Sequence, residues 1–330
     1  MLLTLRLILR PTLRLLAALL ISGALTGAPS AQTPYPSRPV RVIIPFGPGG
    51  FADITMRLVG QELSERIGQQ VVIENKPSAG GIIAGSAVTS AQPDGYTLFM
   101  LTSGIALSKA LLETMPFDPG TAFLPVSTLA QFDLLVLVKS ESSIRTVNDA
   151  LVQARTDPAR FNIGTISPGS TQNVTGELFR ATTGVAMTIV PYRTTGEVLT
   201  SLLRGDTQIA IDTYAALKPA IDAGTIRAIA ATGDTRSPMQ PNVPTLKESN
   251  VTFTVVGWNA LVAPAGTPQD VVAFLNRRVR EIVDSPDFKK RMLDLGGEAK
   301  ASTPEELDAR LHSDIAMWDG VVKKAGLEPH

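Results

Sequence analysis

Short runs rich in valine and isoleucine alternate with helical patterns along most of this sequence. The first run, residues 40–46, ends at residues 47–50, and apolar residues then recur three and four positions apart up to Ile67. That spacing is typical of one face of an amphipathic helix. Similar runs follow at 71–74 and 96–101. Strand patterns that alternate with helices predict an α/β fold with mainly parallel strands.

A second set of patterns begins at residues 134–138. Its helical patterns cover residues 147–156, 171–182 and 195–204, and its strand patterns cover 161–166, 187–190, 208–212 and 226–231. Because each set has strands and helices enough for a core of its own, we expect two lobes.

The last part of the chain predicts a return to the first lobe, because its two closing helices have no strands of their own. We therefore expect a first lobe made of residues 32–131 and 257–330 and a second made of residues 132–256. The chain would cross between them near 129–133 and near 254–258. Two crossings would form a hinge beside a ligand cleft.

The N-terminus has the pattern of a secretory signal. Arg6, Arg10 and Arg14 precede an apolar run at 15–25, and small residues follow up to position 31. The run is short for a membrane span, so we expect residues 1–31 to be removed on export to the periplasm. An uncleaved membrane anchor is the alternative.

Composition excludes several classes of function. The chain has no cysteine, so it can form neither a disulfide nor a thiolate nucleophile. Loss of the three leader arginines would change 30 basic and 30 acidic residues to 27 and 30, a net charge of −3. Such a charge argues against nucleic acid as a partner.

The loop that follows the first strand has the features of an anion site. A strand ends, glycines let the backbone approach a ligand, and a helix starts with free N–H groups. The candidate ligand-binding residues here are Phe46, Gly47, Pro48, Gly49, Gly50 and Phe51. An ordinary strand-to-helix turn is the alternative for a motif this short.

A second loop of the same kind lies in the other predicted lobe. It follows the strand at 161–166 and supplies Ser167, Gly169, Ser170 and Thr171. Ligands bind at the carboxyl ends of strands in open α/β sheets. We therefore expect backbone donors at positions 49–50 and 169–170 to face one anion, although Ser170 or Thr171 could simply cap a helix.

Five further residues are candidates for the same cleft. Thr102 and Ser103 follow the strand at 96–101, and Tyr192 and Asp212 follow later strands. Asp53 lies in the first turn of a helix, where a carboxylate stabilises the N-terminus, so its role could be purely structural. Asp212 could likewise be a cap or part of the cleft wall.

Several segments along the chain resemble Bug-type solute-binding receptors of tripartite tricarboxylate transporters. They are residues 45–53 (PFGPGGFAD), 74–81 (ENKPSAGG), 93–98 (PDGYTL), 190–193 (VPYR), 236–245 and 261–268 (LVAPAGTP). The resemblance implies a type II periplasmic-binding-protein fold and a carboxylate held by main-chain amides and waters. It also implies delivery of the ligand to a membrane permease. We expect the receptor to be a monomer. Residues 171–174 and 194–195 depart from the family pattern, so the ligand's identity does not transfer.

Enzyme classes fit the sequence poorly. Gly47, Gly49 and Ala52 match a dinucleotide-binding fingerprint, but Phe51 places a ring where phosphates would pass. His312 and His330 are the two histidines, too few for a catalytic triad or a zinc site. We expect no catalytic residue, cofactor or metal. An exported nucleotide-dependent oxidoreductase and a sensor that presents ligand to a signalling partner remain as alternatives.

Overall fold

The computed structural model describes residues 35–111 and 114–324. The predicted signal peptide, residues 1–31, lies outside the described residues. The chain divides into two compact units, Met1–Ser37 and Arg38–His330, and the fold below is that of the second. Among the described helices, none has the length and hydropathy needed to cross a bilayer.

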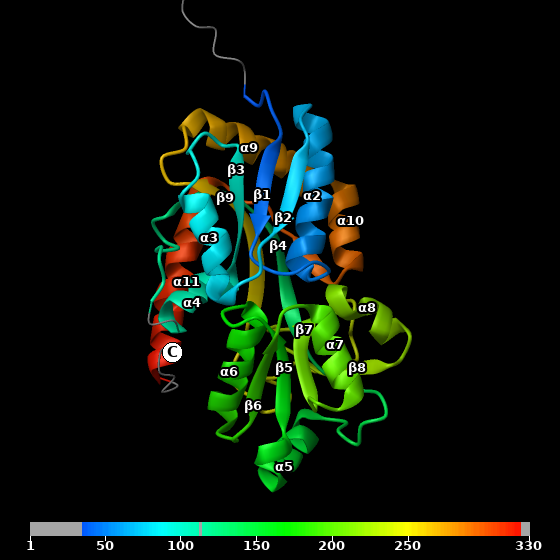
Figure 1. Ribbon diagram of the computed structural model, residues 1–330. Helices are drawn as coiled ribbons and strands as arrows, with labels where there is room; N and C mark the ends of the chain where they lie inside the picture. Colours follow the sequence, from blue (N-terminus) through cyan, green and yellow to red (C-terminus); the bar gives the residue numbers. More distant parts are fainter. Residues whose placement is uncertain (1–34, 112–113, 325–330) are drawn as a thin grey trace, which may run out of the picture. The chain divides into compact units, whose positions relative to one another are not determined.

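The first and last parts of this unit together form a mixed sheet (Figure 1). Its strands are β1 (Val40–Ile44), β2 (Val71–Asn75), β3 (Thr97–Thr102), β9 (Val256–Pro264), the first part of β4 (Phe123–Lys139) and β10 (Gly297–Ala299). The order is β2-β1-β3-β9-β4. Strands β1 to β3 are parallel, as predicted, whereas β9 is antiparallel to both β3 and β4.

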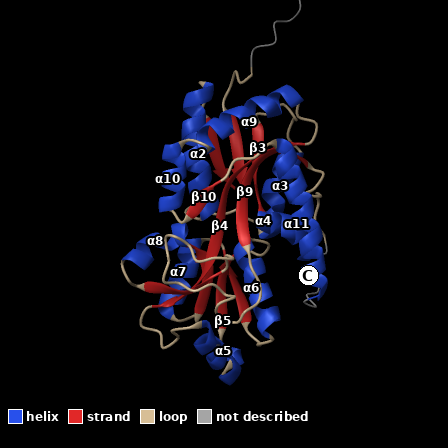
Figure 2. Cartoon of the chain, turned by 180° about the vertical axis from the view of Figure 1, so that it is seen from behind, coloured by secondary structure: helices blue, strands red, loops and turns tan. Residues whose placement is uncertain are grey.

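Helices cover both faces of this sheet (Figures 1 and 2). On one side lie α2 (Phe51–Ile67), α9 (Gln269–Val283) and α10 (Pro286–Asp294), and on the other α3 (Ile82–Thr89), α4 (Ser103–Leu111) and α11 (Pro304–Lys324). Phe99, Trp258 and Leu311 belong to one buried apolar cluster. The last helix of the chain therefore completes the core of the first sheet.

The middle of the chain, residues 147–231, repeats the alternation of strands and helices. Its strands are β5 (Asn162–Ile166), β6 (Thr188–Tyr192), β7 (Ile209–Thr213) and β8 (Ile226–Ala231), and its helices are α5 (Val147–Thr156), α6 (Thr171–Thr183), α7 (Thr195–Arg204) and α8 (Tyr214–Asp222). Strands β5, β6 and β7 are parallel, and β4 is antiparallel to β7 and β8. Helix α6 lies on one side of these strands and α7 and α8 on the other (Figures 1 and 2).

Strand β4 links the two sets of strands. Its residues up to Asp133 pair with β9, and those from Leu134 pair with β7. The change of partner falls beside the first predicted crossing. Only the part of β4 after residue 133 was predicted from the sequence, because the apolar residues at 123–133 do not recur with a clear period. The division into two lobes stays a prediction.

Candidate functional site

A small cavity lies where helices α2 and α6 begin. Its lining residues are Phe46, Gly50, Phe51, Ala52, Thr102, Phe132, Ile166, Thr171, Gln172 and Asn259. Its volume is about 20 Å³, which is room for about one water molecule. The two segments selected from the sequence thus contribute to one small cavity.

The two helix N-termini give this cavity a positive electrostatic character. Helix α2 starts at Phe51, and its N-cap residue Gly50 has no side chain to occupy the free amides. Helix α6 starts at Thr171, where the Ser170 hydroxyl accepts a hydrogen bond from the Asn173 N–H at 3.0 Å. First-turn N–H groups have no acceptor within their own helix, and the helix dipole adds partial positive charge. An anion between the two helices would be stabilised by both.

Two buried polar side chains at the cavity have no hydrogen-bond partner among the described residues. They are Thr102 through Oγ1 and Asn259 through Nδ2, and their exposed fractions are 2% and 1%. A buried polar group without a partner costs about 1–3 kcal/mol. Such groups in a cavity are therefore expected where a ligand supplies the missing partner.

The two sides of the cavity are held together by direct hydrogen bonds. They are Ser103 Oγ with Thr171 Oγ1 at 2.9 Å, the Gly104 N–H to Thr171 Oγ1 at 3.1 Å, the Ser108 hydroxyl to the Gly169 carbonyl at 3.0 Å and the Gly80 N–H to the Pro168 carbonyl at 2.9 Å. Helix α4 and the turn at residues 79–81 thereby contact the loop before α6 and the first residue of α6.

Glycines make this close approach possible. A Cβ atom on Gly104 would lie 2.3 Å from the Thr171 nitrogen, and one on Gly169 would lie 2.2 Å from Ser108 Oγ. Gly169 also has a φ of +77°, a left-handed conformation that other residues rarely adopt. Neither position tolerates a side chain while the two loops are in contact.

Several of the main-chain N–H groups predicted to bind the ligand already have acceptors within the protein. The Gly49 N–H donates to Asp53 Oδ2 at 3.0 Å, the Gly169 N–H donates to Asn173 Oδ1 at 3.3 Å, and the Ser170 N–H donates to the Ser167 carbonyl at 3.1 Å. Side chains from the first helical turns fold back onto the loops before them. The backbone amides available to an anion are therefore those that follow in the chain, in the first turns of α2 and α6.

Asp53 holds the first loop rather than lining the cavity. Its carboxylate accepts hydrogen bonds from the Gly49 N–H, from Arg57 Nε at 3.0 Å and from Asn75 Nδ2 at 2.9 Å. Burial alone would raise the pKa of Asp53, but the hydrogen bonds from Arg57, Gly49 and Asn75 outweigh it and lower the pKa. These contacts therefore favour a purely structural role for Asp53, the alternative given in the sequence analysis.

We expect Asp53→Asn to lower the free energy of unfolding by about 1 kcal/mol at pH 7, because an amide accepts fewer hydrogen bonds than a carboxylate. The folded pKa is lowered, so the contribution of Asp53 is complete above the unfolded pKa of about 4 and lost as the pH falls through the folded value. Urea titrations at pH 7 and at pH 3 would measure this difference. A variant that lost equal stability at both pH values would contradict it.

Asp212 is fully buried and lies behind the cavity. Gln172 Nε2 donates to it at 3.0 Å, Thr195 Oγ1 at 2.8 Å and the Thr213 N–H at 2.8 Å. Burial raises the pKa of Asp212, and these three hydrogen bonds oppose the rise. The residue thus positions Gln172, which lines the cavity, and it does not line the cavity itself.

The other predicted residues lie near the cavity or away from it. Ser103 contacts Thr171 rather than the cavity, and Pro48 and Gly49 are exposed. Gly47 packs against Thr194, where a Cβ would lie 2.8 Å from a methyl carbon. Ser167 and Tyr192 line a separate surface pocket of about 370 Å³ together with residues 77–79, Pro168, Pro191 and Arg193.

Sequence reasoning missed half of the cavity wall. The missed residues are Ala52, Phe132, Ile166, Gln172 and Asn259. Ala52 and Gln172 could have been predicted, because each is the second residue of a helix whose start the sequence indicates. Asn259 gave one signal, a polar residue within the apolar run of β9. Phe132 gave none, because its apolar side chain is ordinary for a strand.

Comparison with known proteins decides the family. The model of the tripartite tricarboxylate transporter family receptor matches residues 55–327. The chain belongs to this family. The receptor is 30% identical to the BugT protein of Bordetella pertussis over 318 residues, which cover 95% of the receptor and 98% of BugT. The family is one of solute-binding receptors, so the oxidoreductase alternative does not hold.

Solved structures agree with this assignment. A protein of R. palustris solved with adipate is 34% identical, with a TM-score of 0.86 over 90% of the receptor and 100% of that chain. MatC from Rhodopseudomonas palustris, solved with bound malate, is 30% identical, with a TM-score of 0.83 over 87% of the receptor and 100% of MatC. The periplasmic binding protein BugD is 28% identical, with a TM-score of 0.85 over 90% of the receptor and all of its own chain. These matches confirm the predicted periplasmic-binding-protein fold.

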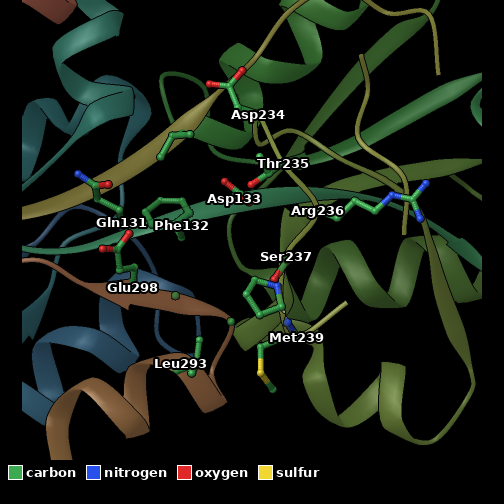
Figure 3. Close-up of a pocket in the computed structure, with 14 residues that line it drawn as sticks. Gln131, Phe132, Asp133, Asp234, Thr235, Arg236, Ser237, Met239, Leu293 and Glu298 are labelled. Carbon is green, nitrogen blue, oxygen red and sulfur yellow. Dashed lines mark hydrogen bonds between the residues drawn. The ribbon is translucent and has the colours of Figure 1, made fainter. Parts of the chain in front are cut away.

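A larger cavity of about 400 Å³ lies beside the change of partner in β4 (Figure 3). Phe132 lines this cavity as well as the one between the helices, and its ring lies 4.6 Å from that of Phe51. Asp133 lies next to it, and burial, followed by the nearby charge of Asp234, raises the pKa of Asp133 to about 6. We call this space the β4 cavity; it adjoins the candidate site through one aromatic side chain.

Proposed function

We propose that this protein is a periplasmic receptor that binds a small organic carboxylate between helices α2 and α6. It would then deliver the ligand to the membrane permease of a tripartite tricarboxylate-type transporter. The observation that carries the proposal is the meeting of two helix N-termini with Thr102 and Asn259, whose side chains lack partners among the described residues, at one small cavity.

The lining of the cavity supports an anionic ligand. No aspartate or glutamate is among its lining residues, so no acidic side chain would be in direct contact with a carboxylate there. Each helix N-terminus carries roughly half a positive charge, and two of them together balance about one negative charge. Charge-assisted hydrogen bonds from the first-turn amides would contribute about 1.5–3 kcal/mol each.

The bound ligands of similar structures support the same class. The proteins solved with adipate and with malate both hold carboxylates, and each matches this chain over most of its length. The family name and the similar periplasmic structures support delivery to a permease and a location outside the inner membrane. Export by cleavage within residues 1–31, and a monomeric state, complete the proposal.

Ligand entry requires the two sides of the cavity to separate. A space of about 20 Å³ admits a water molecule but no organic acid. We therefore include in the proposal two lobes that part around β4 and β9 and close over the ligand, with the hydrogen bonds from Ser103, Gly104 and Ser108 re-formed on closure. A permease could distinguish loaded from empty receptor by this change.

A thermal-shift screen of the mature chain tests the proposal. We expect at least one small carboxylate to raise the melting temperature, because a ligand at ten times its Kd adds about 1.4 kcal/mol, or about 2 °C for a protein of this size. The screen should include monocarboxylates, dicarboxylates, tricarboxylates and aromatic acids, with the matching amides as uncharged controls. Stabilisation by nucleotides alone, or by amides as strongly as by acids, would overturn the proposal.

A further inference from the structure

The β4 cavity lies between two segments that belong to different sets of strands. One wall is formed by the end of α10 and by β10, through Leu293 and residues 296–298. The other wall is the segment that follows β8, residues 234–239. Residues 131–133 of β4 and Val256 of β9 line the space between these walls. Figure 3 shows the two walls on opposite sides of the space, so the cavity spans the crossing between the two sets of strands.

The order of the strands places this cavity and the candidate ligand site on opposite sides of β4. In the first sheet β9 pairs with one edge of β4 and β10 with the other. Thr102 and Asn259, which line the ligand site, are partners in the pairing of β3 with β9. The ligand site is therefore on the β9 side of β4, whereas the β4 cavity is on the β10 side. Phe132, on the strand between them, lines both.

The opening of the ligand site in the proposed function is a rotation about this crossing. Strand β4 is continuous there, paired with β9 up to Asp133 and with β7 from Leu134, so it can serve as the axis of a hinge. A rotation moves the regions on the two sides of its axis in opposite directions. When the starts of α2 and α6 separate, the walls of the β4 cavity therefore approach each other. We call the conformer with α4 against the loop before α6 closed, and the separated one open.

Large apolar side chains border the β4 cavity and are partly exposed in the closed conformer. Leu293 is 47% exposed and Val256 is 37% exposed, and Pro238 and Met239 belong to the wall opposite Leu293. Single exposed apolar residues are common on protein surfaces, but these four line one space between two walls. Approach of the walls would remove their apolar surface from water, which is favourable. The open conformer thus gains an apolar contact that the closed conformer lacks.

We propose that Leu293 and Val256 pack against Pro238 and Met239 in the open conformer and that this contact holds the empty receptor open. The inference rests on the proposed function, because it assumes that the ligand binds as the two sides come together. A ligand that needs the closed conformer has an apparent affinity reduced in proportion to the closed fraction. Residues that never touch the ligand would in this way set how tightly the receptor holds it.

Two polar substitutions test this contact. Leu293→Gln and Val256→Thr keep the approximate volume, and both positions are exposed in the closed conformer, so the fold should be retained. A polar group that is buried without a partner costs free energy, so each variant should disfavour the open conformer. We expect isothermal titration to show that each variant binds the acid selected by the thermal-shift screen about fivefold more tightly than the wild type, that is by about 1 kcal/mol.

Matched substitutions elsewhere control for a polar group added at the surface. Val72→Thr on β2 and Val152→Gln on α5 change side chains that are 41% and 52% exposed and lie outside the β4 cavity. Both should leave the affinity within about twofold of the wild type. Small-angle scattering should show that empty Leu293→Gln and Val256→Thr are more compact than the empty wild type, whereas the loaded receptors should be alike. The ratio of affinities for two different acids should stay unchanged, because neither residue touches the ligand.

The outcomes separate this inference from the proposed function. If no carboxylate binds the wild type, the proposed function fails, and the scattering of the empty receptors still tests the apolar contact. If carboxylates bind and neither variant binds them more tightly than the wild type, the contact is overturned. A gain for one acid and not for another would also overturn it, since it would place these residues at the ligand. Equal gains in the control variants would assign the effect to any added polar group and overturn it as well.

Discussion

Gly104→Ala is expected to lower the affinity for the bound carboxylate at least about 100-fold, or about 2.7 kcal/mol. A Cβ at this position would lie 2.3 Å from the Thr171 nitrogen and 2.5 Å from the Ser170 carbonyl carbon. Both are backbone atoms, so no rotamer change relieves the contact. The alanine side chain therefore prevents α4 from meeting the loop before α6, whereas a separated conformer tolerates it.

Titration of whichever acid the thermal-shift screen selects would measure this loss. Small-angle scattering should also show that the wild type becomes more compact with ligand and the variant does not. Gly196→Ala is a matched control, because Gly196 is also the second residue of a helix and its Cβ would meet nothing nearer than 3.8 Å. Unchanged affinity in Gly104→Ala would show that the contacts of Ser103, Gly104 and Thr171 are not needed for binding.

Asp133→Asn is expected to stabilise the folded protein at pH 7 by about 1–3 kcal/mol. Burial and the charge of Asp234 raise the pKa of Asp133 to about 6, whereas an aspartate in the unfolded chain titrates near pH 4. The carboxylate lies against Gly233, where a Cβ would be 2.4 Å from Asp133 Oδ2. Among the described residues, no hydrogen bond or ion pair compensates its charge.

The sign of the pH dependence follows from linkage. Between about pH 4 and pH 6 the folded state holds a proton on Asp133 that the unfolded state has lost, so stability falls as the pH rises through this window. The penalty is complete above about pH 6, and the asparagine variant removes it. The gain should therefore be largest at pH 7–8 and should vanish near pH 4.

Urea unfolding of wild type and variant at pH 4, 6 and 8 would measure the difference. The exposed Asp206 gives a control, since Asp206→Asn should change stability by less than about 0.5 kcal/mol at each pH. A destabilised Asp133→Asn at pH 8 would mean that the carboxylate has a favourable partner in the β4 cavity. Equal gains at pH 4 and pH 8 would contradict titration as the cause.

The strands and helices next to the site were predictable because their signals are local. Residues 195–204 and 147–156 are helices with the predicted bounds, and the start of α6 at Thr171 was also located. Glycines at a strand end and a cap residue before an apolar stripe specify such starts without help from the rest of the chain. Antiparallel β9 was not predicted as such, because the direction of a strand depends on where the chain returns.

The cavity was predictable only in outline. Phe46, Gly50, Phe51, Thr102 and Thr171 came from the two loops and the end of β3, each beside a strand's carboxyl end. Asp212 was a candidate for the wall and lies behind it instead, because Gln172, Thr195 and Thr213 surround its carboxylate. The Gln172 and Thr195 bonds join residues forty and seventeen positions apart, and such bonds leave no local pattern in the sequence.

The sequence by itself determined that two glycine-bearing loops would each end a strand and begin a helix. Interactions between residues within one helical turn of each other are enough to specify where these strands end and these helices begin. The tertiary structure decided which amides remain free, since Asp53 and Asn173 occupy the Gly49 and Gly169 N–H groups. It also decided that Thr102 would face Asn259, because strand pairing joins residues that are distant in the chain and assigns their side chains to a common face.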